Sequence, residues 1–114
     1  MKNHSININE ATVKAYVEKL RPASPDIRAQ IDIGYSFEQN TVILFQIRPL
    51  WNDPTKKQHL EFAKVRYFKS KKLWNLYWKG GNDTWKLYKP FPSSTHLSQI
   101  IDVIKKDKHN CFYG

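Results

Sequence analysis

Cationic and aromatic side chains, which together can contact phosphates and stack on bases, concentrate between residues 56 and 89. This segment holds ten Lys and Arg against two acids, and therefore +8 of the chain's net charge of +9. It also holds eight of the sixteen aromatic residues. Grooves for single-stranded nucleic acid combine these two kinds of side chain. A basic β-sheet with an aromatic core has the same composition, so the segment indicates where a ligand would bind and what charge it would carry.

Side-chain alternation along two expected strands selects the residues that would form such a surface. Over residues 73–79 and 84–89 we expect the tryptophans to face the core and the tyrosines, with most of the lysines, to face outward. Cations from the preceding strand would join that outer face. The cations would contact phosphates and the tyrosines would stack on bases. The candidate nucleic-acid-binding residues are Arg48, Lys64, Arg66, Tyr77, Lys79, Lys86, Tyr88 and Lys89.

Structural alternatives stay open for the same residues. The lysines can simply solvate the outer face and protect the edges of the sheet, while the tyrosines fill gaps between strands. Arg48, close to Trp51, can clamp an anion or form a structural corner. In that corner Arg48 would pair with Asp53 or cap loop carbonyls, and Trp51 would cover the edge of the core. We favour the corner.

Catalytic and metal-binding patterns are weak. His59 and Glu61 stand two residues apart on an expected strand with Asp53 upstream, a triplet that a metal-dependent nuclease can use. The solvated start of a strand explains these residues better. His109 and Cys111 are also two apart, but a zinc site needs three or four ligands and the sequence offers no second pair with suitable spacing. We predict no catalytic residue, no metal and no cofactor, and favour a protein that is not an enzyme.

Hydrophobic periodicity predicts the elements that would position these residues. Apolar residues recur every three or four positions from Ile8 to Leu20, which predicts a helix, and Pro22 and Pro25 predict a rigid loop after it. Residues 49–57 read as another loop. The expected strands are 29–38, 42–48, 60–68, 73–79 and 84–89, and a second amphipathic helix includes residues 97–104. The fold class is therefore α+β, a five-stranded antiparallel β-meander flanked by an N-terminal and a C-terminal helix.

Length and composition predict a single domain over residues 1–114, long enough to bury its own core. The one cysteine, Cys111, can form no disulfide within the chain. The first residues lack the apolar segment of a signal peptide, and no apolar run approaches the ~18 residues of a membrane-spanning helix. We therefore expect a cytoplasmic protein that does not enter a membrane.

Five segments stand out by their order and spacing: LFQIRPLW (44–51), AKVRY (63–67), WNLYW (74–78), WKLY (85–88) and CFYG (111–114). Together they resemble a bacterial family named domain of unknown function 3024. The resemblance spans roughly Asn9 to Gly114 and implies a small free-standing bacterial protein. It implies no activity, because the family has no assigned substrate, cofactor or catalytic residue. The aromatic pair before the final glycine matches the family and implies a docked C-terminal tail.

Three functional hypotheses follow from the sequence. The leading one is a non-enzymatic module that binds polyanions, foremost single-stranded nucleic acid or RNA. The competing one is a protein interaction module, such as a homodimer formed through an exposed strand or the aromatic tail, in which the charge serves solubility alone. The weakest is a nuclease that uses Asp53, His59 and Glu61.

Overall fold

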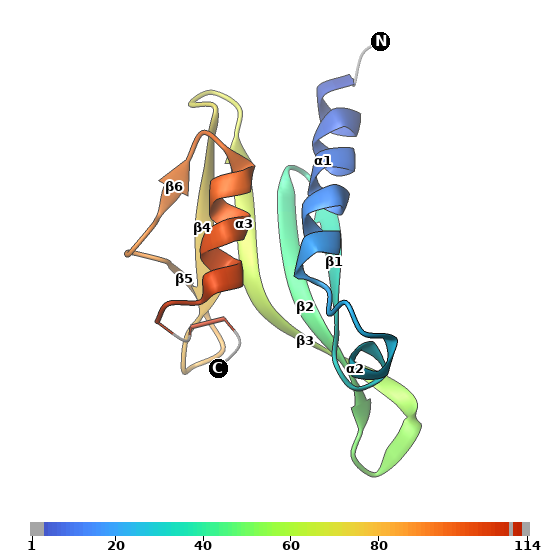
Figure 1. Cartoon of the computed structure of the whole chain (residues 1–114). Coiled ribbons are helices and arrows are strands. Elements are labelled where there is room, and N and C mark those ends of the chain that lie inside the picture. The colour runs from blue at the N-terminus through green and yellow to red at the C-terminus, as the bar shows by residue number, and fades with distance from the viewer. Residues whose placement is uncertain (1–3, 110, 113–114) are drawn as a thin grey trace.

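Two long helices lie on one face of a curved antiparallel sheet in the computed structural model, which describes residues 4–109, 111 and 112, without the side chains of residues 4–9 (Figure 1). The helices α1 (His4–Leu20) and α3 (Leu97–Lys106) are the first and last elements of the chain and contact each other. Five strands pair in chain order, each antiparallel to the next. They are β1 (Asp32–Glu38), β2 (Thr41–Leu50), β3 (Asp53–Phe68), β4 (Leu73–Lys79) and β5 (Trp85–Leu87).

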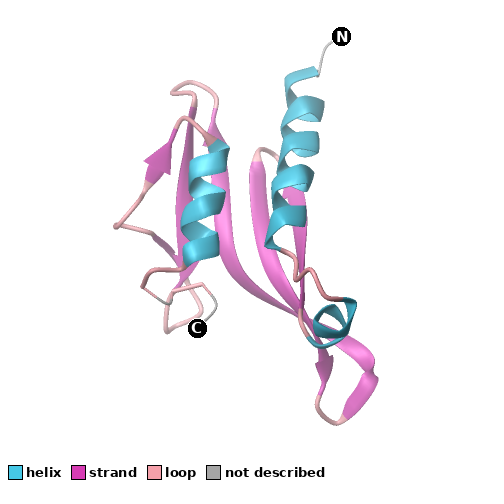
Figure 2. Ribbon diagram, viewed as in Figure 1, coloured by secondary structure: helices cyan, strands magenta, loops and turns pink. Residues whose placement is uncertain are grey.

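The predicted α+β class and the five-stranded meander between terminal helices are confirmed (Figure 2). Two short elements were not predicted. The helix α2 (Pro25–Gln30) replaces the expected loop and the start of the expected first strand, because a proline is tolerated in the first turn of a helix. The strand β6 (Ser93–Ser94) pairs with β4 beside β5.

The core lies between the sheet and the helices. Side chains alternate along each strand, so one set faces α1 and α3 and the other set faces away from them. Among the fully buried side chains are Leu44 on β2, Leu76 on β4, and Ile100 and Ile104 on α3. The helical spacing of the two isoleucines places them on one face of α3, as the periodicity predicted.

A β-bulge midway along β3 adds one residue and so shifts which residues of the strand face the helices. Leu44 pairs with Ala63 and the next residue of β2, Phe45, pairs with Glu61, so Phe62 is an extra residue. Both Phe62 and Ala63 are buried in the core. Because of the bulge, Glu61 lies on the face of the sheet opposite α1 and α3.

The hairpin of β2 and β3 extends beyond the rest of the sheet as an arm, which comprises residues 48–58 (Figure 1). β1 pairs with β2 only as far as Ile47, so the arm has no third strand beside it on that edge. Trp51 at the tip is 91% exposed. The prediction of a loop here is therefore wrong, as is the prediction that Trp51 covers the edge of the core.

Candidate nucleic-acid interface

The face of the sheet opposite α1 and α3, called here the open face, brings several predicted site residues together. Directly paired residues of neighbouring strands point to the same side of a sheet. Lys64 pairs with Tyr77, and Arg66 pairs with Asn75. Lys79 pairs with Trp85 on the last strand. These six residues from β3, β4 and β5 therefore occupy one side of the molecule.

Three cation–π contacts organise this part of the open face. The Lys64 ammonium lies 5.2 Å from the centre of the Tyr77 ring. The Arg66 guanidinium lies 5.0 Å from the Phe68 ring, and the Lys79 ammonium lies 4.8 Å from the Trp85 ring. The negative face of an aromatic ring attracts each cation. Positive charge and flat rings are consequently held side by side on the same surface.

The three cations differ in how much charge they can offer a ligand. Lys79 Nζ lies 3.0 Å from Glu61 Oε1 and 3.6 Å from Asp83 Oδ1. Its hydrogen bond to Glu61 raises the pKa of the ammonium, which is consistent with a close attraction between the two groups. Lys64 and Arg66 form no ion pair with any residue that the structure describes. The charge available to a phosphate is therefore on Lys64 and Arg66.

Two predicted residues lie on the other side of the sheet. Lys86 pairs with Trp78 and so shares the side that carries the helices. Tyr88 is only 2% exposed and its ring lies 4.9 Å from that of Phe112, and burial raises the pKa of its hydroxyl. The prediction that Tyr88 and Lys86 share a face with Tyr77 and Lys79 is wrong, and a buried Tyr88 cannot stack on a base.

Arg48 and Lys89 also lie apart from the open face. Arg48 Nε donates a hydrogen bond of 2.9 Å to Oε1 of Gln46, a buried residue of the helix-bearing side. The proposed pairing of Arg48 with Asp53 is therefore wrong. Lys89 is exposed in the turn after β5, where it borders a hollow together with Lys86 and Tyr88.

Sequence reasoning missed three residues of the open face. Trp85 was expected in the core, yet it contacts Lys79 on the open face. Phe68 and Asn75 were not selected at all, although alternation along β3 and β4 places them beside Arg66. Lys64, Arg66 and Phe68 alternate along β3, and this spacing could have predicted that the Phe68 ring lies on the open face.

The nuclease triplet is not assembled. His59 stacks on the Phe45 ring, with 4.4 Å between ring centres, and Glu61 bonds to Lys79. Asp53 lies at the far end of the arm, where its carboxylate accepts a hydrogen bond from Thr55. Asp53 pairs with Leu50 and Glu61 pairs with Phe45, five positions apart along β2, so the two residues lie roughly 17 Å apart. Within the described residues, no group of three or more His, Cys, Asp or Glu could hold a metal ion.

Comparison with known families gives a match along the whole chain. Residues 1–114 match the family model described as Domain of unknown function (DUF3024). No match was found among curated proteins or among solved structures. In the part of the chain that the structure describes, no helix is both long and apolar enough to cross a membrane. The geometry of the open face is accordingly the main guide to function.

Proposed function

The chain belongs to the DUF3024 family, and we propose that this member binds single-stranded nucleic acid on the open face of its sheet. One observation carries the proposal. Lys64 over Tyr77 and Arg66 over Phe68 form two adjacent pairs of a cation and a ring on the open face, which none of the described helices covers. A single strand offers a phosphate and a flat base at every step, and so matches both members of each pair.

The broad sheet surface favours single strands over duplexes. In a duplex the faces of the bases are stacked on one another, whereas in a single strand they can be splayed onto protein rings. Tyr77 and Phe68 can reach a base only in the second case. The cations alone would contact the phosphates of either form.

The energies allow a ligand to replace the internal contacts. A cation–π contact at an exposed site contributes about 0.5–1 kcal/mol, and a base stacked on an aromatic ring contributes about 1–3 kcal/mol. A base can therefore displace the Lys64 ammonium from the Tyr77 ring. The displaced ammonium remains close enough to contact the phosphate of the same nucleotide.

Binding is best tested by fluorescence anisotropy with labelled single strands of about twelve nucleotides, a length that one binding domain can cover. We expect saturable binding of RNA or DNA that weakens as salt rises. Lys64→Ala combined with Arg66→Ala should weaken binding at least about tenfold. It should also reduce the slope of log K against log salt by about 0.7 for each phosphate that the variant no longer neutralises. The sheet itself should remain folded, because both side chains reach its surface.

A charge-matched variant separates the open face from charge in general. Lys14 and Lys105 are exposed on the two long helices, on the other side of the sheet. Lys14→Ala combined with Lys105→Ala removes the same charge and should leave the affinity nearly unchanged. Equal losses of affinity in the two double variants, or no salt-dependent binding by the unmodified protein, would contradict the proposal.

Trp51 favours a protein partner as the competing function. Tryptophan is enriched at protein interfaces, and an indole that is 91% exposed at the tip of an arm is available for such a contact. Self-association is the simplest form of this proposal. Sedimentation velocity at increasing protein concentration should then show a dimer that Trp51→Ala abolishes, whereas a monomer at all concentrations would exclude the homodimer.

A further inference from the structure

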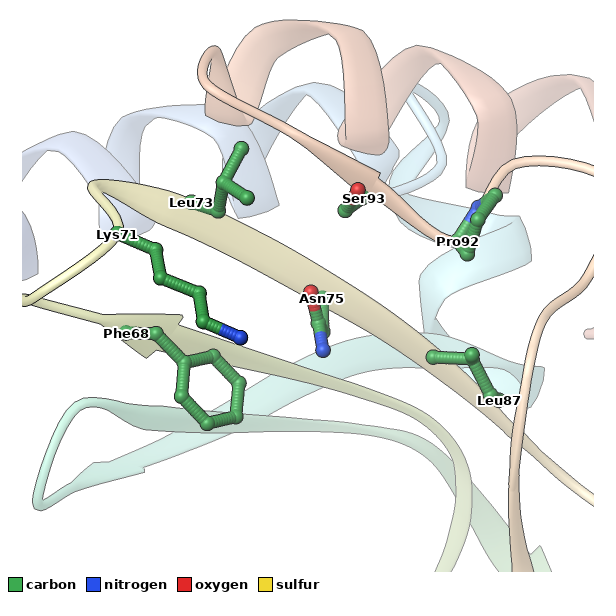
Figure 3. Close-up of a pocket in the computed structure, with 7 residues that line it drawn as sticks. All are labelled: Phe68, Lys71, Leu73, Asn75, Leu87, Pro92 and Ser93. Carbon is green, nitrogen blue, oxygen red and sulfur yellow. The ribbon is translucent and has the colours of Figure 1, made fainter.

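A hollow of about 270 Å³ on the open face is lined by residues of β3, β4, β5 and β6 and of the turn between β3 and β4 (Figure 3). Phe68 and Leu73 pair across β3 and β4, and Asn75 on β4 pairs with Arg66, so the hollow continues the surface proposed to bind single strands. Its volume is below the ~300–1,000 Å³ of sites for whole small molecules. It therefore suits one planar ring. The lining residues are Phe68, Lys71, Leu73, Asn75, Leu87, Pro92 and Ser93.

The Asn75 carboxamide gives the hollow a specific polar group. Asn75 is half-buried and lies between Lys71 and Leu87 (Figure 3). Its side-chain amide makes no hydrogen bond with any side chain or backbone group that the structure describes. An amide with a free donor and a free acceptor can pair with two adjacent groups on the edge of a base. The apolar neighbours Phe68 and Leu87 can contact the faces and rim of the same ring.

Lys71 makes the hollow selective among bases. Figure 3 shows its ammonium end directed toward Asn75. An ammonium only donates hydrogen bonds, so it favours an edge that presents a carbonyl oxygen. Guanine, uracil and thymine have a carbonyl beside a ring N–H. The Asn75 side-chain oxygen can accept a hydrogen bond from that N–H, while the Asn75 side-chain nitrogen and the Lys71 ammonium donate to the carbonyl. Adenine and cytosine have an amino group in place of that carbonyl. This amino group is itself a hydrogen-bond donor and would face the donors of Lys71 and Asn75.

We propose that this hollow holds one base of the bound strand and prefers a base with a carbonyl beside a ring N–H over adenine and cytosine. The inference rests on the proposed function, because it assigns a base preference to the same open face. It assigns Asn75 and Lys71 to base recognition, and Lys64 and Arg66 to contacts that do not depend on base identity.

The test compares two cytosine-rich single strands of about twelve nucleotides that differ only in carrying adenine or hypoxanthine at the same positions. Hypoxanthine differs from adenine in replacing the amino group with a carbonyl and the adjacent ring nitrogen with an N–H. The unmodified protein should bind the hypoxanthine strand about 5- to 150-fold more tightly, the range for one well-made bidentate pair. Asn75→Leu, which removes the amide but retains the size of the side chain, should bring the ratio close to one.

Lys71 is tested against a lysine of the same turn. Lys71→Met should reduce the preference for hypoxanthine, whereas Lys69→Met, which removes the same charge from an exposed residue outside the hollow, should preserve it. Circular dichroism confirms that each variant is folded. Equal affinity of the unmodified protein for the two strands would overturn this inference and leave the proposed function standing. Failure to bind either strand would overturn both.

Discussion

Lys64 and Lys79 share the open face but differ in the groups that they contact. The Lys64 ammonium contacts the Tyr77 ring, whereas Lys79 joins Glu61 on β3 to Asp83 in the turn after β4. Substitution of Lys79 would therefore affect the attachment of this turn as well as the charge of the surface. Lys64 and Arg66 are the better positions at which to test ligand binding.

The pair formed by Arg21 and Asp32 gives the protein a defined response to acid. Two hydrogen bonds of 2.9 and 2.8 Å join the guanidinium after α1 to the carboxylate at the start of β1. The bond to Arg21 holds the pKa of Asp32 below its ordinary value of 3.8. The folded state therefore binds this proton less readily than the unfolded state. The resulting stabilisation is present above pH 3.8 and is lost as the pH falls through the lower pKa of the folded state.

Asp32→Asn should accordingly lower the free energy of unfolding at neutral pH, because it leaves Arg21 without its charged partner. The difference between this variant and the unmodified protein should disappear in acid below the folded-state pKa of Asp32. Urea titrations at a series of pH values measure both effects. Asp102→Asn is the control, since Asp102 pairs with Lys106 on the surface of α3 and such pairs contribute little. A difference that persists unchanged in acid would contradict the assignment.

Alternation along single strands predicted half of the candidate site correctly. It placed Lys64, Arg66, Tyr77 and Lys79 together because six of the seven residues of β4 pair regularly with the end of β3. At β5 it separated Trp85 and Leu87 from Lys86 and Tyr88 correctly but could not say which set faces the core, because the pairing of Trp85 with Lys79 and of Lys86 with Trp78 decides that. Beyond that short strand the burial of Tyr88 is set by Phe112, which is distant in sequence. Side-chain alternation within one strand cannot predict a contact with a residue so far along the sequence.

At the scale of elements, the arm shows where turn signals mislead. Pro49, Asn52 and Pro54 are typical of loops, yet Leu50 pairs with Asp53 around a two-residue turn and the strands continue on both sides. Prolines are tolerated in strands that lack a partner on one edge, and the arm is such a pair. The meander was predictable because its strands and turns alternate regularly, whereas the length of the arm was not.

The position of each tryptophan predicts its contribution to stability. Trp74 on β4 is buried and its ring contacts Tyr67, so Trp74→Ala should lower the free energy of unfolding by about 3–5 kcal/mol. Trp51→Ala at the tip of the arm should change it by less than about 0.5 kcal/mol. Urea denaturation followed by circular dichroism compares the two. A destabilisation at Trp51 as large as that at Trp74 would show that the arm packs against the rest of the protein.

The whole molecule is two-sided, with helices on one face of the sheet and the proposed ligand on the other. We expect a bound single strand to protect Lys64 from chemical acetylation several-fold, because its ammonium would contact phosphate. Lys14 on α1 and Lys105 on α3 should react at unchanged rates, since both are exposed on the opposite side. Mass spectrometry of the acetylated protein with and without the strand measures all three. Protection of Lys14 and Lys105 without protection of Lys64 would place the ligand on the helix-bearing face and contradict the proposal.

The contact between α1 and α3 has a consequence for how the protein folds. Every strand from β1 to β5 pairs with its neighbour in the chain, and such local contacts form quickly. The two helices, by contrast, lie near opposite ends of the sequence, and bringing them together requires closure of a loop that contains the entire sheet. We therefore expect hairpins to form first and the helix pair to close last. Until that final step, the apolar face of the sheet remains open to solvent.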